Sequence, residues 1–434
     1  MHSLFDPFII IDQGYNRKKL NIGLKDLVIF QSLLKEKLLT EKQLYRYYTI
    51  VNFRKISYPG FWKKLVKFEE YGLIKGYKYK VGQNGTTIKY FSLKQKGHDI
   101  LVAHDRVPPN YENANFNNIP KSNLDHHFGT KEVILNSLIA YEDLYPFYQE
   151  PTAFPPRLTR VFPAAIPDGV IKLNERTLYI EFDSGSETLG ELKSKVARYL
   201  DDAKENKEVE SDEGLLITLL DNSIPNRKGI EDRTSRIRNL TKTITSLPEL
   251  LAKNIPIYIL PLSIAAKGAV SYLGDHRNAT FRSNARKISD LLVRSKCHNA
   301  LESNTKEVTE NYLRNYCITA HLIDVHEKTR DRSFLTLFQY KELGNIRDYD
   351  QIDKLAKYGC MEPKCTAEFL YVIYDDEETM RTDVKISGAL QKVRYLSLEA
   401  LREESFVNKP YVFIRDTKST VKKVYDQRQW PNLF

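Results

Sequence analysis

The 434-residue sequence contains few cysteines and no long apolar segment. Its four cysteines are too few for a disulfide scaffold in a chain of this length, so we expect a reducing, cytoplasmic environment. The apolar run at residues 8–11 is shorter than the core of a signal peptide, and no run reaches the length that spans a membrane. We therefore expect no membrane partner.

The cysteines also give little indication of a metal site. Cys360 and Cys365 have four residues between them, and Cys297 and Cys317 would have to complete a tetrahedral zinc set. Because Cys297 and Cys317 each lack a close-spaced partner, we interpret all four residues as separate thiols that bind no zinc.

Several catalytic signatures are missing as well. The sequence has no phosphate-binding glycine loop, no nucleophile elbow and no HExxH motif. These absences argue against an ATPase, a hydrolase of the serine class and a zinc protease. The sequence also has no pair of histidines one residue apart, which self-contained relaxases and rolling-circle initiators need together with a nucleophilic tyrosine.

Positive charge is in excess. The formal net charge is +10, and apolar residues make up 41% of the chain, which is enough for a packed core. A basic protein of this kind tends to meet polyanions, of which nucleic acid is the commonest. The alternative is a basic surface that has no partner.

We expect a multidomain α/β protein with three blocks. Residues 20–105 read as helices followed by a hairpin, and residues 106–123 form a linker rich in Pro and Asn. Residues 124–262 alternate helix and strand patterns. Residues 263–434 read as a further mixed α/β region, whose role the sequence does not indicate.

The first block begins with two predicted helices. Leu27, Phe30 and Leu34 recur at helical spacing, which predicts a helix with one buried face. Thr40 is a good N-cap and Gln43 follows three residues later, so this pair predicts a capping box at the start of a second helix.

A third helix and a hairpin complete the first block. Residues 58–71 carry an apolar stripe, and Gly72 follows as a C-cap. The dipeptide Asn84-Gly85 predicts a hairpin turn. Three helices followed by a hairpin favour a winged helix-turn-helix, in which the third helix enters the major groove of DNA and the hairpin lies along the backbone.

Lysines mark both parts of this predicted DNA surface. They would contact the phosphates of double-stranded DNA and give a salt-dependent affinity rather than sequence readout. The alternatives are that the lysines only solvate the surface, or that the winged helix docks a protein. The candidate DNA-binding residues are Lys63, Lys64 and Lys67 on the third helix and Lys75, Lys78, Lys80 and Lys89 on the hairpin.

Three carboxylates converge in the second block. The dipeptide Asn174-Glu175 predicts a two-residue hairpin turn, and in that register Asp168 lies directly across from Glu181. Asp183 points to the same face of the sheet. Clustered carboxylates repel one another unless a cation lies among them, and ligands of this kind suit Mg²⁺ or Mn²⁺. Such a metal would activate water and stabilise a phosphodiester during cleavage.

A helix is predicted after the second strand of this hairpin. Ser184 with Glu187 resembles a capping box at its start. Lys195 and Tyr199 are four residues apart and share one side at the edge of the apolar face. We expect both side chains to lean toward the carboxylates.

These motifs resemble known families. Asp168 in "PDG", Glu181 in "IEFD" and the order strand–strand–helix–strand resemble the PD-(D/E)XK nuclease superfamily. Lys195 and Tyr199 in "KVARY" look like the Q/K-xxx-Y helix of its RecB-like branch. Over roughly residues 20–220, the combination with a winged helix is similar to the replication-relaxation family of Gram-positive plasmids and mobile elements.

The resemblance implies a DNA-processing role in plasmid replication or relaxation, with replication or transfer proteins as further partners. Asp168, Glu181 and Asp183 would hold the metal, and Lys195 would orient the attacking water. The sequence departs from the superfamily at Asp183, where a lysine is usual, so Lys195 would have to substitute for it. The alternative is a non-catalytic DNA-binding regulator or replication accessory factor that retains a degenerate nuclease fold.

Two adjacent histidines precede the first helix of this block. His126 and His127 could contact DNA or a metal. A histidine at the start of a helix is more often a capping or surface residue, and we interpret both in that way.

Overall fold

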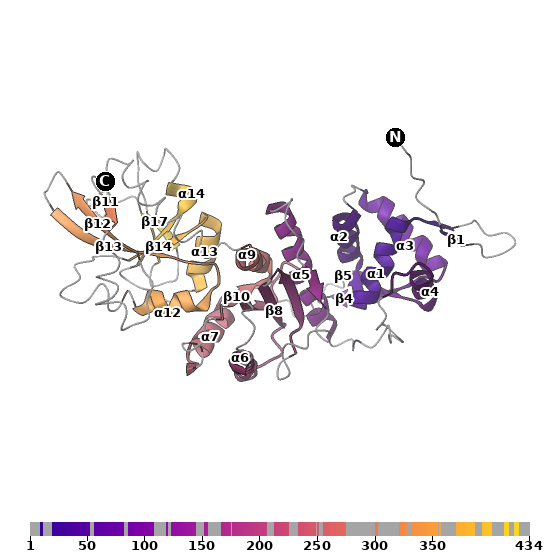
Figure 1. Cartoon of the computed structure of the whole chain (residues 1–434), viewed down its shortest axis with the longest axis horizontal. Helices are drawn as coiled ribbons and strands as arrows, with labels where there is room; N and C mark the ends of the chain where they lie inside the picture. The colour runs from indigo at the N-terminus through magenta and orange to yellow at the C-terminus, as the bar shows by residue number, and fades with distance from the viewer. Residues whose placement is uncertain are drawn as a thin grey trace. The chain divides into compact units, whose positions relative to one another are not determined.

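Figure 1 shows the computed structural model of the whole chain. The chain forms two compact units. Unit 1 comprises Met1–Asn174, Tyr179–Ser186 and Leu220–Glu231, and unit 2 comprises Glu175–Leu178, Glu187–Leu219 and Asp232–Phe434. The structure describes residues 9–11, 20–52, 56–81, 86–107, 119, 123–144, 152–154, 166–174, 176–205, 212–224, 233–248, 250, 255–274, 300–302, 321–327, 332–354, 356, 370–386, 393–401, 412–415 and 421–424.

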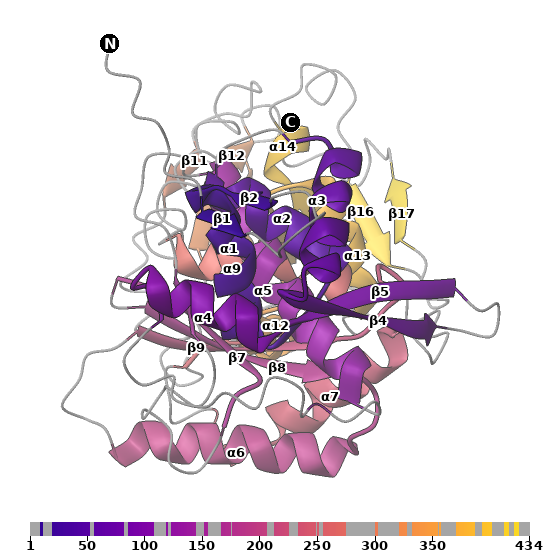
Figure 2. The same cartoon turned by 90° about the vertical axis from the view of Figure 1, so that its right-hand side faces the viewer.

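The N-terminal block of unit 1 has the predicted order of three helices followed by a hairpin. The helices are α1 (Leu27–Glu36), α2 (Glu41–Asn52) and α3 (Tyr58–Glu70), and the hairpin strands are β4 (Ile74–Val81) and β5 (Thr86–Leu93). Strands β4 and β5 lie side by side in Figure 2. The sequence did not predict η1 (Leu24–Asp26), β3 (Leu38–Thr40), α4 (Gln95–Ala103) or the antiparallel pair β1 (Ile9–Ile11) and β2 (Leu20–Ile22).

Local hydrogen bonds fix the start of α2 as predicted. The backbone N–H of Gln43 donates to the Thr40 hydroxyl at 3.3 Å, and the N–H of Thr40 donates to the Gln43 side chain at 3.1 Å. This reciprocal pair satisfies two N–H groups that a helix start otherwise leaves without a partner. The predicted capping box is therefore confirmed.

The end of α3 also agrees with its sequence. Gly72 has φ of +72°, a left-handed conformation that glycine adopts without steric cost. The next N–H, that of Leu73, donates to the Phe68 carbonyl at 2.9 Å and turns the chain into β4. Strands β4 and β5 pair from Ile74 to Val81, so the hairpin is confirmed, whereas the predicted turn at residues 84–85 lies outside the described residues.

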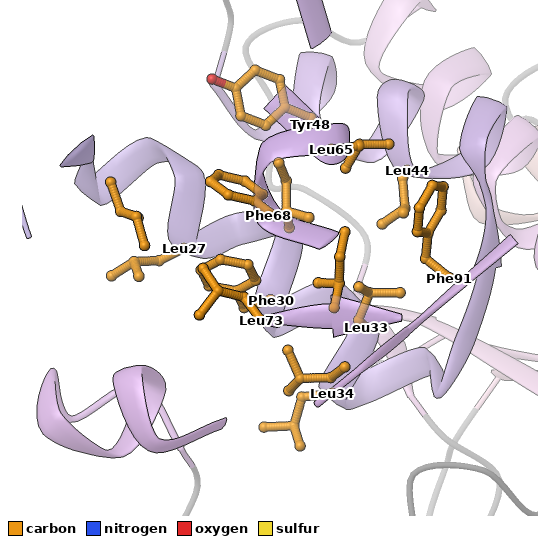
Figure 3. Close-up of a cluster of buried hydrophobic side chains, with 14 of the residues drawn as sticks. Leu27, Phe30, Leu33, Leu34, Leu44, Tyr48, Leu65, Phe68, Leu73 and Phe91 are labelled. Atoms are coloured by element: carbon orange, nitrogen blue, oxygen red, sulfur yellow. The ribbon is translucent and has the colours of Figure 1, made fainter. Parts of the chain in front are cut away.

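An apolar core joins the three helices to the hairpin (Figure 3). The Phe30 ring of α1 packs against the Phe68 ring of α3, with centroids 5.1 Å apart. Leu65 on the same stripe of α3 and Phe91 of β5 are also fully buried. Each such side chain contributes about 1.5–3 kcal/mol on burial, so this core fixes the outward face of α3.

Helix α5 (Leu124–Leu144) packs on the hairpin side of this block. Its residues Leu124 and Phe128 share an apolar cluster with Leu38, Tyr79 and Tyr90. The two strands of the hairpin therefore have α5 against one face and the three-helix core against the other.

Polar contacts reinforce the attachment of α5. Lys131 of α5 and Glu36 of α1 form a buried ion pair with a separation of 2.6 Å. Burial alone would raise the pKa of Glu36, but Lys131 and Lys35 hold the pKa below its ordinary value, so the carboxyl stays ionised. The side chain of Gln43 donates to the Phe128 carbonyl at 2.9 Å.

The opposite side of α5 packs closely on the residues of β7 and β8 that belong to unit 1. A Cβ atom at Gly129 would lie 2.0 Å from the Phe182 ring, a distance that real Cβ atoms essentially never show. A Cβ atom at Gly169 would lie 2.9 Å from Ile134. Glycine is therefore required at position 129 for this close approach.

A five-stranded sheet has the order β10-β9-β8-β7-β6. Strands β6 (Thr152–Phe154) and β7 (Gly169–Leu173) are antiparallel, β8 (Arg176–Asp183) is central, and β9 (Asp212–Leu219) and β10 (Ile257–Pro261) are parallel. The helices of unit 2 next to these strands in sequence are α6 (Leu189–Glu205), α7 (Thr234–Thr245) and α9 (Leu262–Leu273). The strand–strand–helix–strand order predicted from the sequence is present in β7, β8, α6 and β9.

The C-terminal part of unit 2 contains a seven-stranded sheet in the order β11 to β17. Strands β13, β14 and β15 are parallel to one another, and the other neighbours are antiparallel. The strands are β11 (Ala300–Glu302), β12 (His321–Glu327), β13 (Arg332–Tyr340), β14 (Leu370–Tyr374), β15 (Val393–Ser397), β16 (Val412–Arg415) and β17 (Val421–Val424), and the helices are α12 (Ile346–Lys354), α13 (Glu377–Ile386) and α14 (Leu398–Leu401). The described parts of the chain are thus mixed α/β, as predicted.

A buried polar cluster fixes the loop after β13. The Lys341 ammonium lies 3.5 Å from the Asp383 carboxylate and 3.6 Å from the centroid of the Tyr349 ring. The Tyr374 hydroxyl donates to Asp383 at 2.7 Å. The same loop accepts a hydrogen bond from the N–H of Ile259, so it connects this region to β10.

Two predictions fall mainly outside the described residues. All four cysteines lie there, and so does most of the predicted linker at residues 106–123. The interpretation of the thiols and the predicted domain boundaries therefore stay predictions. Among the described helices, none has the length and apolar composition that crossing a membrane requires.

The buried Glu36–Lys131 pair predicts a large loss of stability when one partner is removed. Lys131→Ala leaves the Glu36 charge buried without its closest cation, so we expect the free energy of unfolding to fall by about 3–5 kcal/mol. The double variant Glu36→Leu with Lys131→Met should remain near the wild type, because it removes both charges together. Urea unfolding of the full chain measures both, and a loss below about 1 kcal/mol for Lys131→Ala would contradict the prediction.

Candidate functional site

The outward face of α3 presents two of its three predicted lysines. Lys63 and Lys67 are exposed, because Phe61, Leu65 and Phe68 occupy the buried stripe of the same helix. Residues four positions apart lie on one side of a helix, so Lys63 and Lys67 share a face. Their ammonium groups are accessible to a polyanion.

Lys64, the third of these lysines, turns to the side. Its ammonium lies 2.5 Å from the Asp26 carboxylate of η1 and 5.8 Å from the centroid of the Tyr48 ring. The Lys64 side chain is 27% exposed and that of Asp26 is 7% exposed. A phosphate would have to compete with this partly buried ion pair, so we interpret Lys64 as a residue that anchors α3.

The hairpin lysines divide in the same way. Lys75, Lys78 and Lys80 of β4 are exposed. Lys89 of β5 instead pairs with Glu69 of α3 at 2.8 Å, and its ammonium lies 4.7 Å from the centroid of the Trp62 ring. These contacts attach the hairpin to α3.

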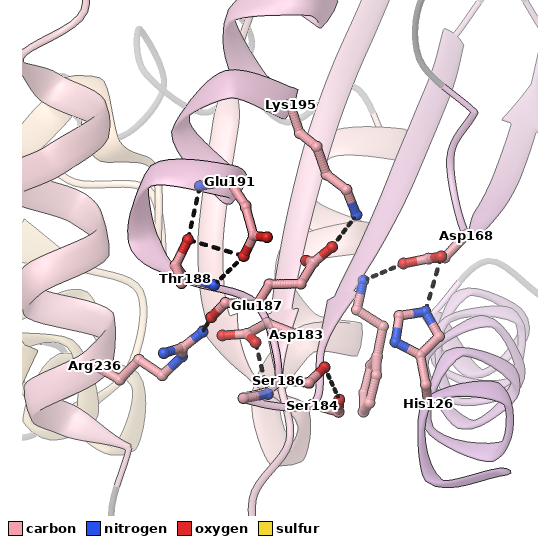
Figure 4. Close-up of polar contacts among 12 residues, drawn as sticks. His126, Asp168, Asp183, Ser184, Ser186, Glu187, Thr188, Glu191, Lys195 and Arg236 are labelled. Atoms are coloured by element: carbon pink, nitrogen blue, oxygen red, sulfur yellow. Dashed lines mark hydrogen bonds and ion pairs between the residues drawn. The ribbon is translucent and has the colours of Figure 1, made fainter. Parts of the chain in front are cut away.

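Asp168 lies beside β8, and both of its carboxylate oxygens are engaged (Figure 4). One oxygen is 2.8 Å from Nε2 of His126, and the other accepts the N–H of Phe182 at 2.8 Å. The backbone N–H of Asp168 donates to the carbonyl of Ile180, a neighbour of the expected partner Glu181. Asn174 has φ of +51°, as a hairpin turn of the predicted kind requires.

The other two predicted carboxylates are buried on β8. Glu181 is 3% exposed and Asp183 is 1% exposed. One oxygen of Asp183 accepts the N–H of Gly185 at 2.7 Å, which closes a tight turn after the strand. Both carboxylates thus lie in the interior.

The carboxylates predicted to bind Mg²⁺ or Mn²⁺ make contacts within the protein. Protein groups engage both oxygens of Asp168 and one of Asp183. Within the described ranges, no three or more His, Cys, Asp or Glu side chains gather in a way that could hold a metal ion. The metal site therefore stays a prediction.

Lys195 and Tyr199 both lie on α6. The Lys195 ammonium pairs with Glu187 at 2.7 Å (Figure 4), and Tyr199 is only 2% exposed. The capping box of α6 is formed by Thr188 and Glu191, four residues after the predicted pair. Glu187 therefore pairs with Lys195 instead of capping the helix.

His126 is a site residue that the sequence interpretation missed. Adjacent helix positions point about 100° apart, so His126 faces Asp168 while His127 faces the Leu38 carbonyl, 2.8 Å from its Nε2. The signal in the sequence was a pair of imidazole rings near the start of a predicted helix. Neither ring is a simple surface residue.

Comparison with known proteins agrees with the resemblance seen in the motifs. The model of the replication-relaxation family matches residues 30–216. Over this part, the chain is similar to the replication-relaxation family. The matched segment runs from α1 into β9, so it contains both the lysine-bearing helix and the surroundings of Asp168. No curated protein and no solved structure matches the chain.

Acid is expected to destabilise the protein through His127. Burial, followed by the nearby charge of Lys131, lowers the pKa of His127 from 6.5 to about 4. The unfolded chain therefore binds this proton more readily, so the contribution of His127 is complete above about pH 6.5 and is lost as the pH falls toward about 4. Denaturant unfolding at pH values from 7 to 4 measures this effect. The free energy of unfolding should fall more steeply for the wild type than for His127→Gln, by at most about 1.4 kcal/mol per pH unit. Parallel pH profiles would contradict this assignment.

Proposed function

We propose that the protein binds duplex DNA and acts in the replication or relaxation of a plasmid or mobile element. The N-terminal block is then a winged helix-turn-helix in which α3 is the recognition helix and the β4–β5 hairpin is the wing. Its order of helices and strands, with β3 completing the sheet, supports this assignment. The match of residues 30–216 to the replication-relaxation family supports the biological role.

The observation that carries the proposal is the division of the lysines. Lys64 and Lys89 pair with carboxylates and attach α3 and the wing to their neighbours. Lys63 and Lys67 remain exposed on the outward face of α3. Structural ion pairs thus account for the lysines at the sides, and the exposure of the outward lysines supports the proposal that α3 contacts the DNA backbone.

The wing adds charge to the same proposal. Lys75, Lys78 and Lys80 are exposed along β4, and the whole chain carries a net charge of +10. Each phosphate that a lysine neutralises releases condensed counterions, so the affinity depends steeply on salt. The proposed interface is therefore dominated by backbone contacts, with α3 in the groove and the wing beside it.

We further propose that the five-stranded sheet with α6 is a PD-(D/E)XK-like fold that serves as a scaffold. Asp183 stands where the superfamily usually has lysine, and Lys195 pairs with Glu187. Asp168 is held by His126 and by the Phe182 N–H. These contacts support the non-catalytic alternative over metal-dependent cleavage.

The salt dependence of DNA binding tests the interface. Lys63→Ala with Lys67→Ala should weaken binding to a duplex and reduce the slope of log affinity against log salt by roughly one unit per lost phosphate contact. Fluorescence anisotropy with one labelled duplex at several salt concentrations measures the slope.

Lys94→Ala with Lys96→Ala provides the matched control. This pair is also exposed and removes the same charge, but it lies at the start of α4. The control should keep the wild-type slope. If all three proteins had equal slopes, or if both double variants lost the same amount of slope, α3 would not bind the DNA backbone.

A plasmid-cleavage assay distinguishes a non-catalytic scaffold from an active nuclease. We expect the wild type to leave supercoiled plasmid uncut in either Mg²⁺ or Mn²⁺, because the engaged carboxylates offer no three-ligand group among the described residues. Gel electrophoresis after incubation measures nicking. Metal-dependent nicking that Asp168→Asn abolishes would contradict the scaffold and support the nuclease.

A further inference from the structure

Tyr58 is an exposed aromatic residue at the first position of α3. Its exposed fraction is 36%, and the described residues contain only two other large apolar side chains that are exposed, Val102 and Ile166. Ser57 precedes it as the N-cap and accepts the N–H of Gly60. Part of the Tyr58 side chain is therefore accessible to a ligand of α3.

Helix α2 holds the Tyr58 side chain in one orientation. The ring packs edge-on against Tyr45, with centroids 5.2 Å apart and an interplanar angle of 90°. The Tyr58 hydroxyl donates to the Glu41 carboxylate. Tyr45 is itself fixed, because its hydroxyl donates to the Ile56 carbonyl at 2.8 Å. The exposed ring is therefore preorganised, and binding would cost little side-chain entropy.

The bond to Glu41 determines what the Tyr58 hydroxyl can offer a ligand. A phenol has one proton to donate, and an ionised carboxylate only accepts. The proton of Tyr58 is thus directed to Glu41, and burial followed by this hydrogen bond raises the pKa of Tyr58, so the phenol stays neutral. The oxygen can then accept a hydrogen bond but has no proton left for a second partner.

We propose that Tyr58, oriented by Glu41 and Tyr45, reads a base edge in the major groove and gives the protein sequence preference that its lysines cannot supply. The amino groups of adenine and cytosine are the donors in that groove, so they are the partners of the Tyr58 oxygen. The thymine methyl group suits the ring. This inference rests on the proposed binding of duplex DNA by α3.

Selection from a randomised duplex library identifies the preferred site of the wild-type full chain. Competition binding then compares that site with duplexes that differ at single base pairs. Tyr58→Phe keeps the ring and its packing on Tyr45 but removes the accepting oxygen. At one base pair with an adenine or cytosine amino group, this variant should lose at least about fivefold of the wild-type discrimination.

Two further variants isolate the chemistry. Glu41→Gln replaces the pure acceptor with an amide that can also donate to the Tyr58 oxygen, so the preference at the same base pair should weaken or change. Tyr71→Phe removes a hydroxyl at the other end of α3 and should keep the wild-type preference. Thermal melting verifies that each variant is folded.

The outcomes are distinguishable. The assignment is supported if Tyr58→Phe and Glu41→Gln lose discrimination at one base pair and Tyr71→Phe keeps the discrimination of the wild type. The assignment would be overturned, while the proposed function stands, if the wild type bound duplex DNA without sequence preference. It would also be overturned if Tyr58→Phe kept the wild-type discrimination or lost affinity equally for all duplexes. If the wild type bound no duplex at all, both the function and this inference would fail.

Discussion

Helix α5 packs against the β4–β5 hairpin on one side and against Phe182 of β8 on the opposite side. The fold of unit 1 depends on both contacts. On one side Leu124 and Phe128 cover the hairpin, and Lys131 forms a buried ion pair with α1. On the other side Gly129 lets the helix approach the Phe182 ring. The N-terminal block and the surroundings of Asp168 are consequently two faces of one packed structure. DNA bound at α3 would therefore have a defined position relative to Asp168.

The basic residues of the N-terminal block have two separate roles. Lys64 and Lys89 form ion pairs with carboxylates of neighbouring elements, where partial burial strengthens the attraction. Lys63 and Lys67 stay exposed, where water and salt screen them until a polyanion approaches. A count of lysines in the sequence could not separate these roles, because the partners Asp26 and Glu69 are distant in the chain or on another element. The fold decides which charges remain available for binding.

Sequence patterns predicted the features that local physics determines. The capping box of Thr40 and Gln43, the left-handed Gly72 and the apolar stripes of the first and third helices all depend on residues within a few positions of one another. Short elements such as β3 and the β1–β2 pair were missed, because three residues carry too little periodicity to distinguish them from a loop.

The candidate site was less predictable, because tertiary contacts determine it. Ser184 and Glu187 have the spacing of a capping box, yet Thr188 and Glu191 form the cap, and Glu187 pairs with Lys195. The partner of His126 is Asp168, 42 positions later in the chain. No local pattern connects residues at such a separation, so the chemistry at this site became visible only in the folded chain.

Hydrogen–deuterium exchange of the full chain, with and without duplex DNA, tests the central claim most directly. Bound DNA shields backbone amides at the surface that it contacts, and the residues around it report on any rearrangement. The account predicts slower exchange in α3 and the β4–β5 hairpin, with exchange in α5 unchanged because its amides are already protected by packing. Protection confined to the C-terminal sheet, with α3 and the hairpin unaffected, would contradict it.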